Sequence, residues 1–160
     1  MSVEIIGIAK RIRKEISELY KIKDIALRRW QKTLTDEDYL GSVAFDLQGF
    51  YQGVERVFEV IARSIDRSVP DGDKWHKMLL EQMANEIPGI RPAVISMETR
   101  EALDRFRMFR HLALNIYSFN LVPERIEGLI KDLPRAVSLV CHDFSSFSDF
   151  LEQSSALKGE

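Results

Sequence analysis

The sequence lacks the features that mark disulfide-stabilised, membrane-spanning and strongly charged proteins. Its single cysteine, Cys141, cannot form an internal disulfide and falls in an apolar helical pattern, where a cysteine is usually a small buried hydrophobe. No apolar run approaches the roughly 18 residues that a membrane span requires, so we expect a cytoplasmic protein without membrane contact. The 23 lysines and arginines nearly balance the 25 aspartates and glutamates, so no overall field attracts nucleic acid. Any contact with nucleic acid must therefore come from a local basic patch.

Several motifs of known chemistry are also missing. The chain has no glycine-rich phosphate loop, no Cys-x-x-Cys pair and no Gly-x-Ser-x-Gly. These absences argue against nucleotide, zinc and serine-hydrolase sites. We therefore expect neither a cofactor nor a bound metal.

Apolar residues recur at steps of three and four through most of the chain, which is the period of amphipathic helices. The pattern predicts helices over residues 3–32, 35–65, 75–83, 97–117 and 123–153. Long helices joined by short polar turns favour an all-α fold. We predict an antiparallel up-and-down helical bundle of four main helices plus a short connecting helix. Residues 1–153 should form a single domain, followed by a polar, frayed tail over 154–160.

Particular residues refine the expected helices. Thr35 and Ser96 have side chains that can cap the helices that follow them. Gly49 and Gly53 lie four apart in the second helix, where their best use is a close helix crossing. The apolar pattern keeps one phase through Pro134, so we expect one last helix, kinked there, and not two helices.

The helix predicted over 97–117 has a polar half that core packing does not explain. At about 100° per residue its apolar residues share one side: Ala102, Phe106, Phe109, Ala113 and Ile116. On the opposite side lie Arg107, His111, Asn115 and Ser118, and the flank between carries Arg110, Leu114 and Tyr117. Periodicity alone favours a solvated surface for this polar half.

RNA cleavage would give the polar half a function. Cleavage without a metal needs a base for the ribose 2′-hydroxyl, an acid for the leaving oxygen and a cation for the phosphate. Histidine suits proton transfer near neutral pH, and the planar fork of arginine matches a phosphate. His111, with Arg107 and Arg110 around it, could supply these parts.

Other polar residues give weaker signals. For Trp75 and His76 we favour a packed tryptophan beside an exposed histidine, and for His142 a surface position. Glu55 and Glu59 lie four apart on one helix face. They could bind a cation or an opposing arginine, but a solvated edge is the simpler interpretation.

A family resemblance changes the weight of these signals. Residues 105–121, RFRMFRHLALNIYSFNL, resemble the signature of HEPN domains, and most closely that of the HepT-like group. Supporting pieces are FYQGVER at 50–56, WHKMLL at 75–80, and Arg91-Pro92 before the fourth helix. Together they span roughly residues 40 to 130 in the right order.

The resemblance implies a homodimeric helical bundle that acts as a metal-independent endoribonuclease toxin and is neutralised by a nucleotidyltransferase antitoxin called MntA. Arg110 matches the arginine of the family motif and His111 its polar position, while Tyr117 matches the tyrosine that the antitoxin modifies with AMP. Asn115 stands where the catalytic histidine belongs, and an amide cannot take a proton at neutral pH. In a second register, Arg105 and His111 satisfy an Arg-x5-His pattern.

The resemblance thus assigns an active site, but it leaves the activity open. The catalytic residues expected are Arg110, His111 and Asn115; Arg105 and Arg107 would bind RNA phosphates, and Glu55 would support the site. The Asn115 departure leaves two alternatives. Beside the active ribonuclease, the chain could be a catalytically degenerate module that binds a nucleotidyltransferase, or a non-enzymatic helical scaffold.

Overall fold

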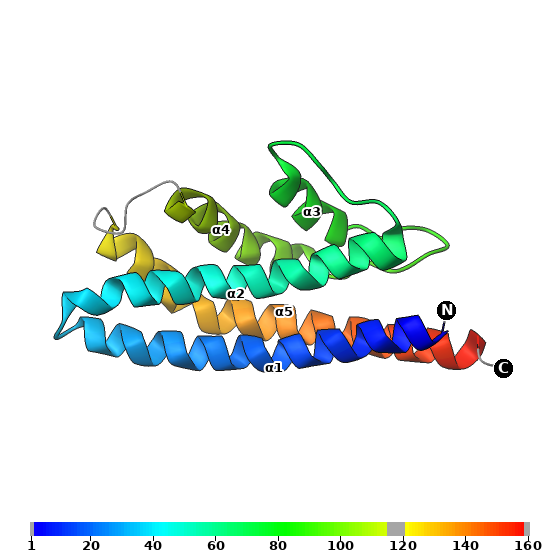
Figure 1. Ribbon diagram of the computed structural model, residues 1–160, viewed down its shortest axis with the longest axis horizontal. Helices are drawn as coiled ribbons and strands as arrows, with labels where there is room; N and C mark the ends of the chain where they lie inside the picture. Colours follow the sequence, from blue (N-terminus) through cyan, green and yellow to red (C-terminus); the bar gives the residue numbers. More distant parts are fainter. Residues whose placement is uncertain (1, 115–120, 159–160) are drawn as a thin grey trace.

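The described part of the chain, residues 2–114 and 121–158 of a computed structural model, is helical and contains no strand. Its elements are α1 (Ser2–Thr33), the 3-10 turn η1 (Glu37–Tyr39), α2 (Leu40–Ile61), the π-turn η2 (Ala62–Asp66), α3 (Trp75–Met83), α4 (Met97–Leu114) and α5 (Pro123–Lys158). The four long helices alternate in direction, and the short α3 lies beside α2 and α4 (Figure 1). The predicted all-α antiparallel bundle is confirmed.

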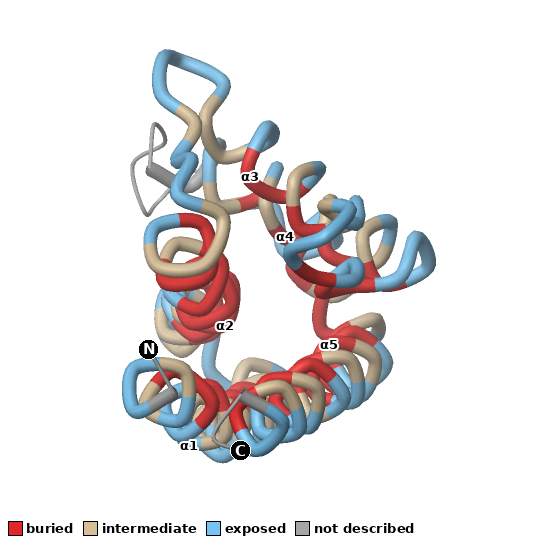
Figure 2. Tube along the Cα trace, turned by 90° about the vertical axis from the view of Figure 1, so that its right-hand side faces the viewer, coloured by how far each residue is buried: buried red, intermediate tan, exposed pale blue. Residues whose placement is uncertain are grey.

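The core lies between the four long helices. Seen end-on, their buried residues turn toward a common centre, and α3 closes one edge (Figure 2). Helix α1 packs along both α2 and α5, while α4 packs on the other side against α2 and α5. Aromatic pairs join α2 to α4 and to α5 across the core. Phe50 meets Phe106 of α4 edge-on, with ring centroids 5.1 Å apart, and Phe58 meets Phe144 of α5 with centroids 5.9 Å apart. Such pairs stabilise a core beyond the apolar area that they bury.

The start of α4 is fixed by a network of side chains. Ser96 caps the helix as expected, because its Oγ accepts from the Thr99 backbone N–H at 3.1 Å. Asp143 of α5 accepts from the Ser96 backbone N–H at 2.9 Å and from the Thr99 hydroxyl at 2.6 Å. The first turn of α4 is therefore tied directly to α5. His142, next to Asp143, is exposed as expected.

The predicted cap at Thr35 is wrong. The Thr35 hydroxyl donates back to the Lys32 carbonyl at 3.3 Å, at the end of α1. Asp36 provides the cap, with its carboxylate accepting from the Asp38 backbone N–H at 3.0 Å. The reason is that the Thr35 hydroxyl lies close enough to the α1 carbonyls to bond there instead.

Only one of the two glycines in α2 serves a helix crossing. A Cβ built on Gly53 would lie 2.6 Å from the Glu15 side chain and 2.9 Å from the Leu19 side chain, both on α1, so a larger residue would displace these side chains where α1 lies close. A Cβ on Gly49 would meet nothing within 4 Å. The prediction is confirmed for Gly53 and wrong for Gly49.

Helix α5 passes Pro134 without a break, which confirms one helix in place of two. The expected frayed tail is corrected: α5 continues to Lys158, and Ser155 is buried. The reason is tertiary, because this end of α5 lies beside the first turns of α1, with both termini at one end of the bundle (Figure 1). Cys141 is a free, buried thiol, as predicted. Among the described residues, no helix is long and apolar enough to span a membrane.

Candidate active site at the junction of α2, α3 and α4

Three helices meet around one buried carboxylate, that of Glu55 on α2. The side chain of Glu55 is 4% exposed. Arg110 of α4 donates from Nη1 to Glu55 Oε1 at 3.0 Å, and Nδ1 of His76 on α3 lies 2.7 Å from Oε2. We call Glu55, His76 and Arg110 the junction cluster. The solvated edge favoured for Glu55 is wrong, and its pairing with an opposing arginine is confirmed.

The chemistry of the three groups requires a proton on Nδ1 of His76. Arginine can only donate hydrogen bonds, and a carboxylate paired with arginine is ionised and can only accept them. The 2.7 Å contact with Glu55 therefore requires a proton on His76 Nδ1. The Arg110 Nη1 to His76 Nδ1 separation of 3.3 Å is then a close approach of two donors. Nε2 is the nitrogen of His76 that can exchange a proton with a ligand.

His76 is accessible, although it is not the freely exposed histidine that we expected. Its side chain is 29% exposed, and its ring stacks on the neighbouring Trp75, with centroids 3.6 Å apart. Exposed lysines, Lys74 and Lys77, flank it in the sequence. The ring is thus held from two sides, by a carboxylate and an indole, and remains reachable from solvent.

The junction cluster and the neighbouring Tyr51 have polar atoms that the described residues do not satisfy. Arg110 Nε and the Tyr51 hydroxyl are buried, and neither has a hydrogen-bond partner within the described ranges. Burial raises the pKa of Tyr51, as does the negative charge of Glu55, one turn further along α2, so the phenol stays protonated. A buried polar atom without a partner typically costs about 1–3 kcal/mol. Both atoms are covered by protein, so they mark an incompletely satisfied polar cluster and do not themselves contact solvent.

Two further arginines of α4, Arg107 and Arg105, have different surroundings. Arg107 lies beside the cluster with its Nε 2.8 Å from Asp104 Oδ1, and its charge acts on Tyr51. Arg105 pairs with Asp132 of α5. At about 100° per residue, it lies roughly 140° around the helix from Arg110. The structure therefore brings Arg107, but not Arg105, toward the junction cluster.

His111 follows Arg110 on the exposed surface of α4. Asn115 and Tyr117, the remaining residues of the resembled motif, lie outside the described residues. So does Ile116 of the expected apolar stripe. Within the described part of that stripe, Phe106 and Phe109 are buried as expected.

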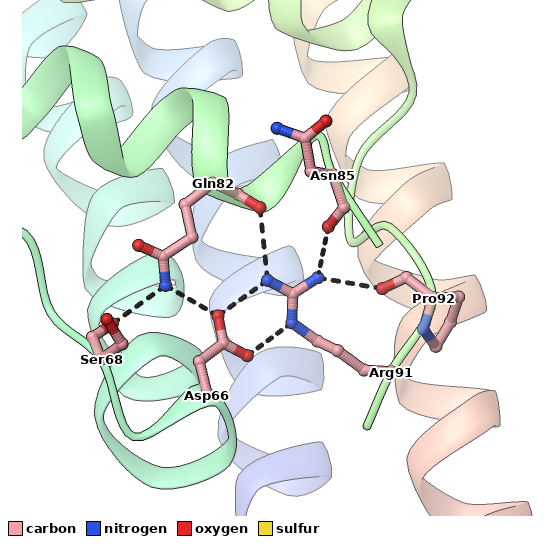
Figure 3. Close-up of polar contacts among 6 residues, drawn as sticks. All are labelled: Asp66, Ser68, Gln82, Asn85, Arg91 and Pro92. Atoms are coloured by element: carbon pink, nitrogen blue, oxygen red, sulfur yellow. Dashed lines mark hydrogen bonds and ion pairs between the residues drawn. The ribbon is translucent and has the colours of Figure 1, made fainter. Parts of the chain in front are cut away.

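A second arginine–carboxylate pair fixes the far end of α3 (Figure 3). Arg91 donates from Nε and Nη2 to the two carboxylate oxygens of Asp66, at 2.5 and 2.7 Å, and both side chains are fully buried. Its other bonds go to three backbone carbonyls, those of Asn85, Pro92 and Gln82. The Gln82 amide in turn donates to Asp66 and to the Ser68 carbonyl. We call Arg91 and Asp66 the α3 clamp, because this pair ties the C-terminal end of α3 to the turn that follows α2.

The sequence contains a signal for the burial of Glu55, in addition to the supporting role that the resemblance implies. Glu55 lies four residues after Tyr51 and three before Phe58, which places it on a face that these aromatics bury. A carboxylate on a buried face needs a positively charged or hydrogen-bonding partner. The residues near Glu55 in the sequence do not show that this partner is Arg110. His76 carried no comparable signal, because its contact with Glu55 spans 21 positions. No group of three or more His, Cys, Asp or Glu side chains in the described ranges could hold a metal ion.

A comparison with known families identifies the family of this chain. Residues 42–151 match the family model described as HepT-like protein. This chain belongs to the HepT-like family. The matched region of this HepT-like chain contains α2, α3 and α4, and therefore the whole junction cluster and the α3 clamp. No curated protein and no solved structure matches the chain significantly.

Proposed function

We propose that this HepT-like chain is an endoribonuclease toxin that cuts RNA without a metal ion. The observation that carries the proposal is the junction cluster, in which Glu55 orients the motif arginine, Arg110. A guanidinium has five N–H donors, and the contact with Glu55 uses only one of its nitrogens. An arginine held in this way loses little freedom when it binds a phosphate, which favours tight and directional binding.

The proposed reaction uses the ribose as its own nucleophile. His111 takes the proton of the 2′-hydroxyl, the 2′-oxygen attacks the adjacent phosphorus, and the bond to the 5′-oxygen breaks. The products are a 2′,3′-cyclic phosphate and a 5′-hydroxyl. Arg110 and Arg107 stabilise the charge on the phosphate, and Asn115 hydrogen-bonds to a phosphate oxygen or a hydroxyl. Arg105, on another side of α4, would be a peripheral phosphate contact.

We further propose that two copies complete the site. His111 lies on the exposed side of α4, so a two-fold axis beside α4 would bring each motif against its copy. Two copies of Arg107 and Arg110 would double the local positive charge. This local charge would offset the near-neutral balance of the chain, which by itself draws no RNA.

A nucleotidyltransferase of the MntA type is the proposed antitoxin. The phenol oxygen of Tyr117 would attack the α-phosphorus of ATP, releasing pyrophosphate and a proton and leaving AMP on the tyrosine. The added phosphate would bring negative charge to the motif that supplies Arg110 and His111. An attached AMP would therefore compete with RNA for the same cations.

A second candidate function rests on Asn115. Because an amide cannot replace the proton transfer of the usual histidine, the chain could be a non-catalytic partner of such a nucleotidyltransferase. This alternative expects a stable complex and AMP on Tyr117, but no RNA cleavage. Intact mass after incubation with the partner and ATP would show one adduct, absent from Tyr117→Phe.

Cleavage in EDTA tests the leading proposal. Purified protein should cut a mixed-sequence RNA in excess EDTA, and His111→Ala should slow cutting by about 10²-fold or more. His142→Ala is the matched control, because this histidine is exposed on α5, away from the junction, and should cut at the wild-type rate. Intact RNA in the presence of wild-type protein over a broad pH range would reject the proposal.

A further inference from the structure

We infer that His76 is the general acid of the proposed reaction and gives its Nε2 proton to the leaving 5′-oxygen of the RNA. This inference rests on the proposed function, and it adds a residue that lies outside the resembled motif. It assigns the α2–α3–α4 junction a proton donor from α3 in addition to the phosphate-binding arginine and the base from α4.

The reaction needs a second proton-transfer group, because the leaving oxygen would otherwise depart as an alkoxide. The chain has three histidines. His142 lies on the exposed face of α5, and His111 already takes the role of base. Asn115 cannot give up a proton at neutral pH. His76 is the histidine that the fold brings to the motif arginine.

The geometry of the junction suits a proton donor. Glu55 holds the proton of Nδ1 through a 2.7 Å hydrogen bond, so only Nε2 is left to release and regain a proton. The carboxylate and the stacked indole of Trp75 fix the orientation of the ring. A histidine held in one orientation by a carboxylate while its other nitrogen works on the substrate is a recurring design for proton transfer.

The position of Arg110 brings the phosphate to His76. Arg110 Nη1 lies 3.3 Å from the imidazole, so a phosphate bound by the remaining donors of Arg110 lies within a few ångströms of the ring. The charged groups around His76 are Glu55 from α2, Arg110 from α4, and the exposed Lys74 and Lys77 of its own segment. The two lysines add positive charge where the RNA backbone would approach.

The proposed step balances without any further reactant. The reactive form of His76 is the imidazolium, with protons on both Nδ1 and Nε2. As the phosphorus–O5′ bond breaks, its electron pair stays on the 5′-oxygen, which takes the Nε2 proton and leaves a neutral His76 with its Nδ1 proton still bonded to Glu55. His111 meanwhile gains the proton of the 2′-hydroxyl. The two histidines therefore exchange protonation states, and solvent resets both before the next turnover.

A substrate with sulfur in place of the bridging 5′-oxygen tests this role. A thiolate leaves without help from an acid, whereas an alkoxide does not, so loss of a general acid should matter for oxygen and not for sulfur. The variant is His76→Asn, whose side-chain N–H can still donate to Glu55 while the Nε2 position is lost. A thermal melt followed by circular dichroism checks that the variant is folded, and His142→Ala is the control.

The expected results separate this inference from the proposed function. His76→Asn should cut ordinary RNA about 10²- to 10⁴-fold more slowly than wild type, and should cut the 5′-thio substrate within about tenfold of the wild-type rate. His111→Ala should be slow on both substrates. Equal slowing of His76→Asn on both substrates, or none on either, would overturn the inference while leaving the proposed function standing. If wild type cuts neither substrate, the proposed function fails and takes the inference with it.

Discussion

The two ends of α3 are each held by an arginine–carboxylate pair, but the two pairs differ in how completely they are satisfied. At the C-terminal end, Arg91 and Asp66 are both fully buried, and all three guanidinium nitrogens are hydrogen-bonded within the protein. At the N-terminal end, Arg110 is 17% exposed, and its buried Nε has no partner in the described residues. A saturated pair has nothing left to offer a ligand.

This difference separates a structural ion pair from a site. Burying charges is costly, and the α3 clamp offsets that cost through hydrogen bonds to all three Arg91 nitrogens and both Asp66 oxygens. In the junction cluster, Arg110 has N–H donors that Glu55 does not use, and His76 is accessible. We therefore expect substitutions in the clamp to act first on folding, and substitutions in the junction cluster to act first on RNA.

The largest effect on stability should come from Arg91→Leu. It would leave the Asp66 carboxylate and three backbone carbonyls buried without their donor, which typically costs about 3–5 kcal/mol in the free energy of unfolding. Urea denaturation followed by circular dichroism measures this loss. The double variant Asp66→Leu with Arg91→Leu should recover part of it, because no unpaired charge remains. A single variant as stable as wild type would show that the clamp is not structural.

At the other end of α3, Glu55→Gln should affect RNA cleavage more strongly than it affects stability. An amide of the same shape can still accept from Arg110 but cannot compensate its charge, so we expect a loss of about 1–3 kcal/mol in the free energy of unfolding. RNA cleavage should fall by more than tenfold, because both Arg110 and His76 lose their common anchor. Cleavage rates and urea midpoints on the same preparation test the contrast. Normal cleavage by a destabilised variant would remove the distinction between the two pairs.

Cys141 can report whether a variant disturbs the bundle as a whole. Burial raises the pKa of its thiol to about 12, with a small opposing effect of Lys23, so the folded protein should hold almost no thiolate at pH 8. We expect a thiol reagent such as DTNB to label the unfolded chain in seconds and the native wild type much more slowly. Labelling should quicken in Arg91→Leu and stay slow in Glu55→Gln. Rapid labelling of the native wild type would contradict the assigned burial.

The smallest effect should come from an exposed pair. Arg13 of α1 bonds to Glu152 and Asp149 of α5, and the Arg13 hydrogen bond holds the pKa of Glu152 below its ordinary value. A lowered carboxyl pKa in the folded state contributes stability at neutral pH that is lost as pH falls through that pKa. Arg13→Ala should therefore lower the melting temperature slightly at pH 7, and the difference should vanish in acid. A larger loss than in Arg91→Leu would invert the order argued above.

The sequence predicted the parts of the fold that follow from periodicity. The apolar residues of α5 that recur at steps of three and four, from Ile126 to Leu151, are buried, because an amphipathic pattern encodes the buried face directly. The buried face is wider than this stripe and also includes Leu129, Ala136, Cys141 and Ser148. The prediction from sequence failed at Thr35, where the adjacent Asp36 provides the cap instead. It also failed at Ser155, because the burial of this residue depends on a distant helix. Local propensity contains no information about such tertiary contacts.

The site was predictable only in part. The polar half of α4 pointed to Arg110, and the resemblance gave Glu55 a supporting role. Neither revealed that Glu55 would bond to Arg110 or that His76 would join them. Those contacts span 55 and 34 positions of the chain. Arg105 was assigned to the same set as Arg107 on sequence spacing, and the fold directs it to Asp132 instead.

Single-turnover cleavage of RNA in EDTA by wild type and by Arg110→Lys tests most directly the claim that the junction cluster is a site. Lysine keeps the charge near Glu55 but loses the planar fork that binds a phosphate, so we predict cleavage slowed by about 10²-fold or more at little cost to folding. Arg135→Lys, at an exposed pair with Glu98 on another part of the surface, should cut normally. Cleavage by Arg110→Lys at the wild-type rate would contradict the account.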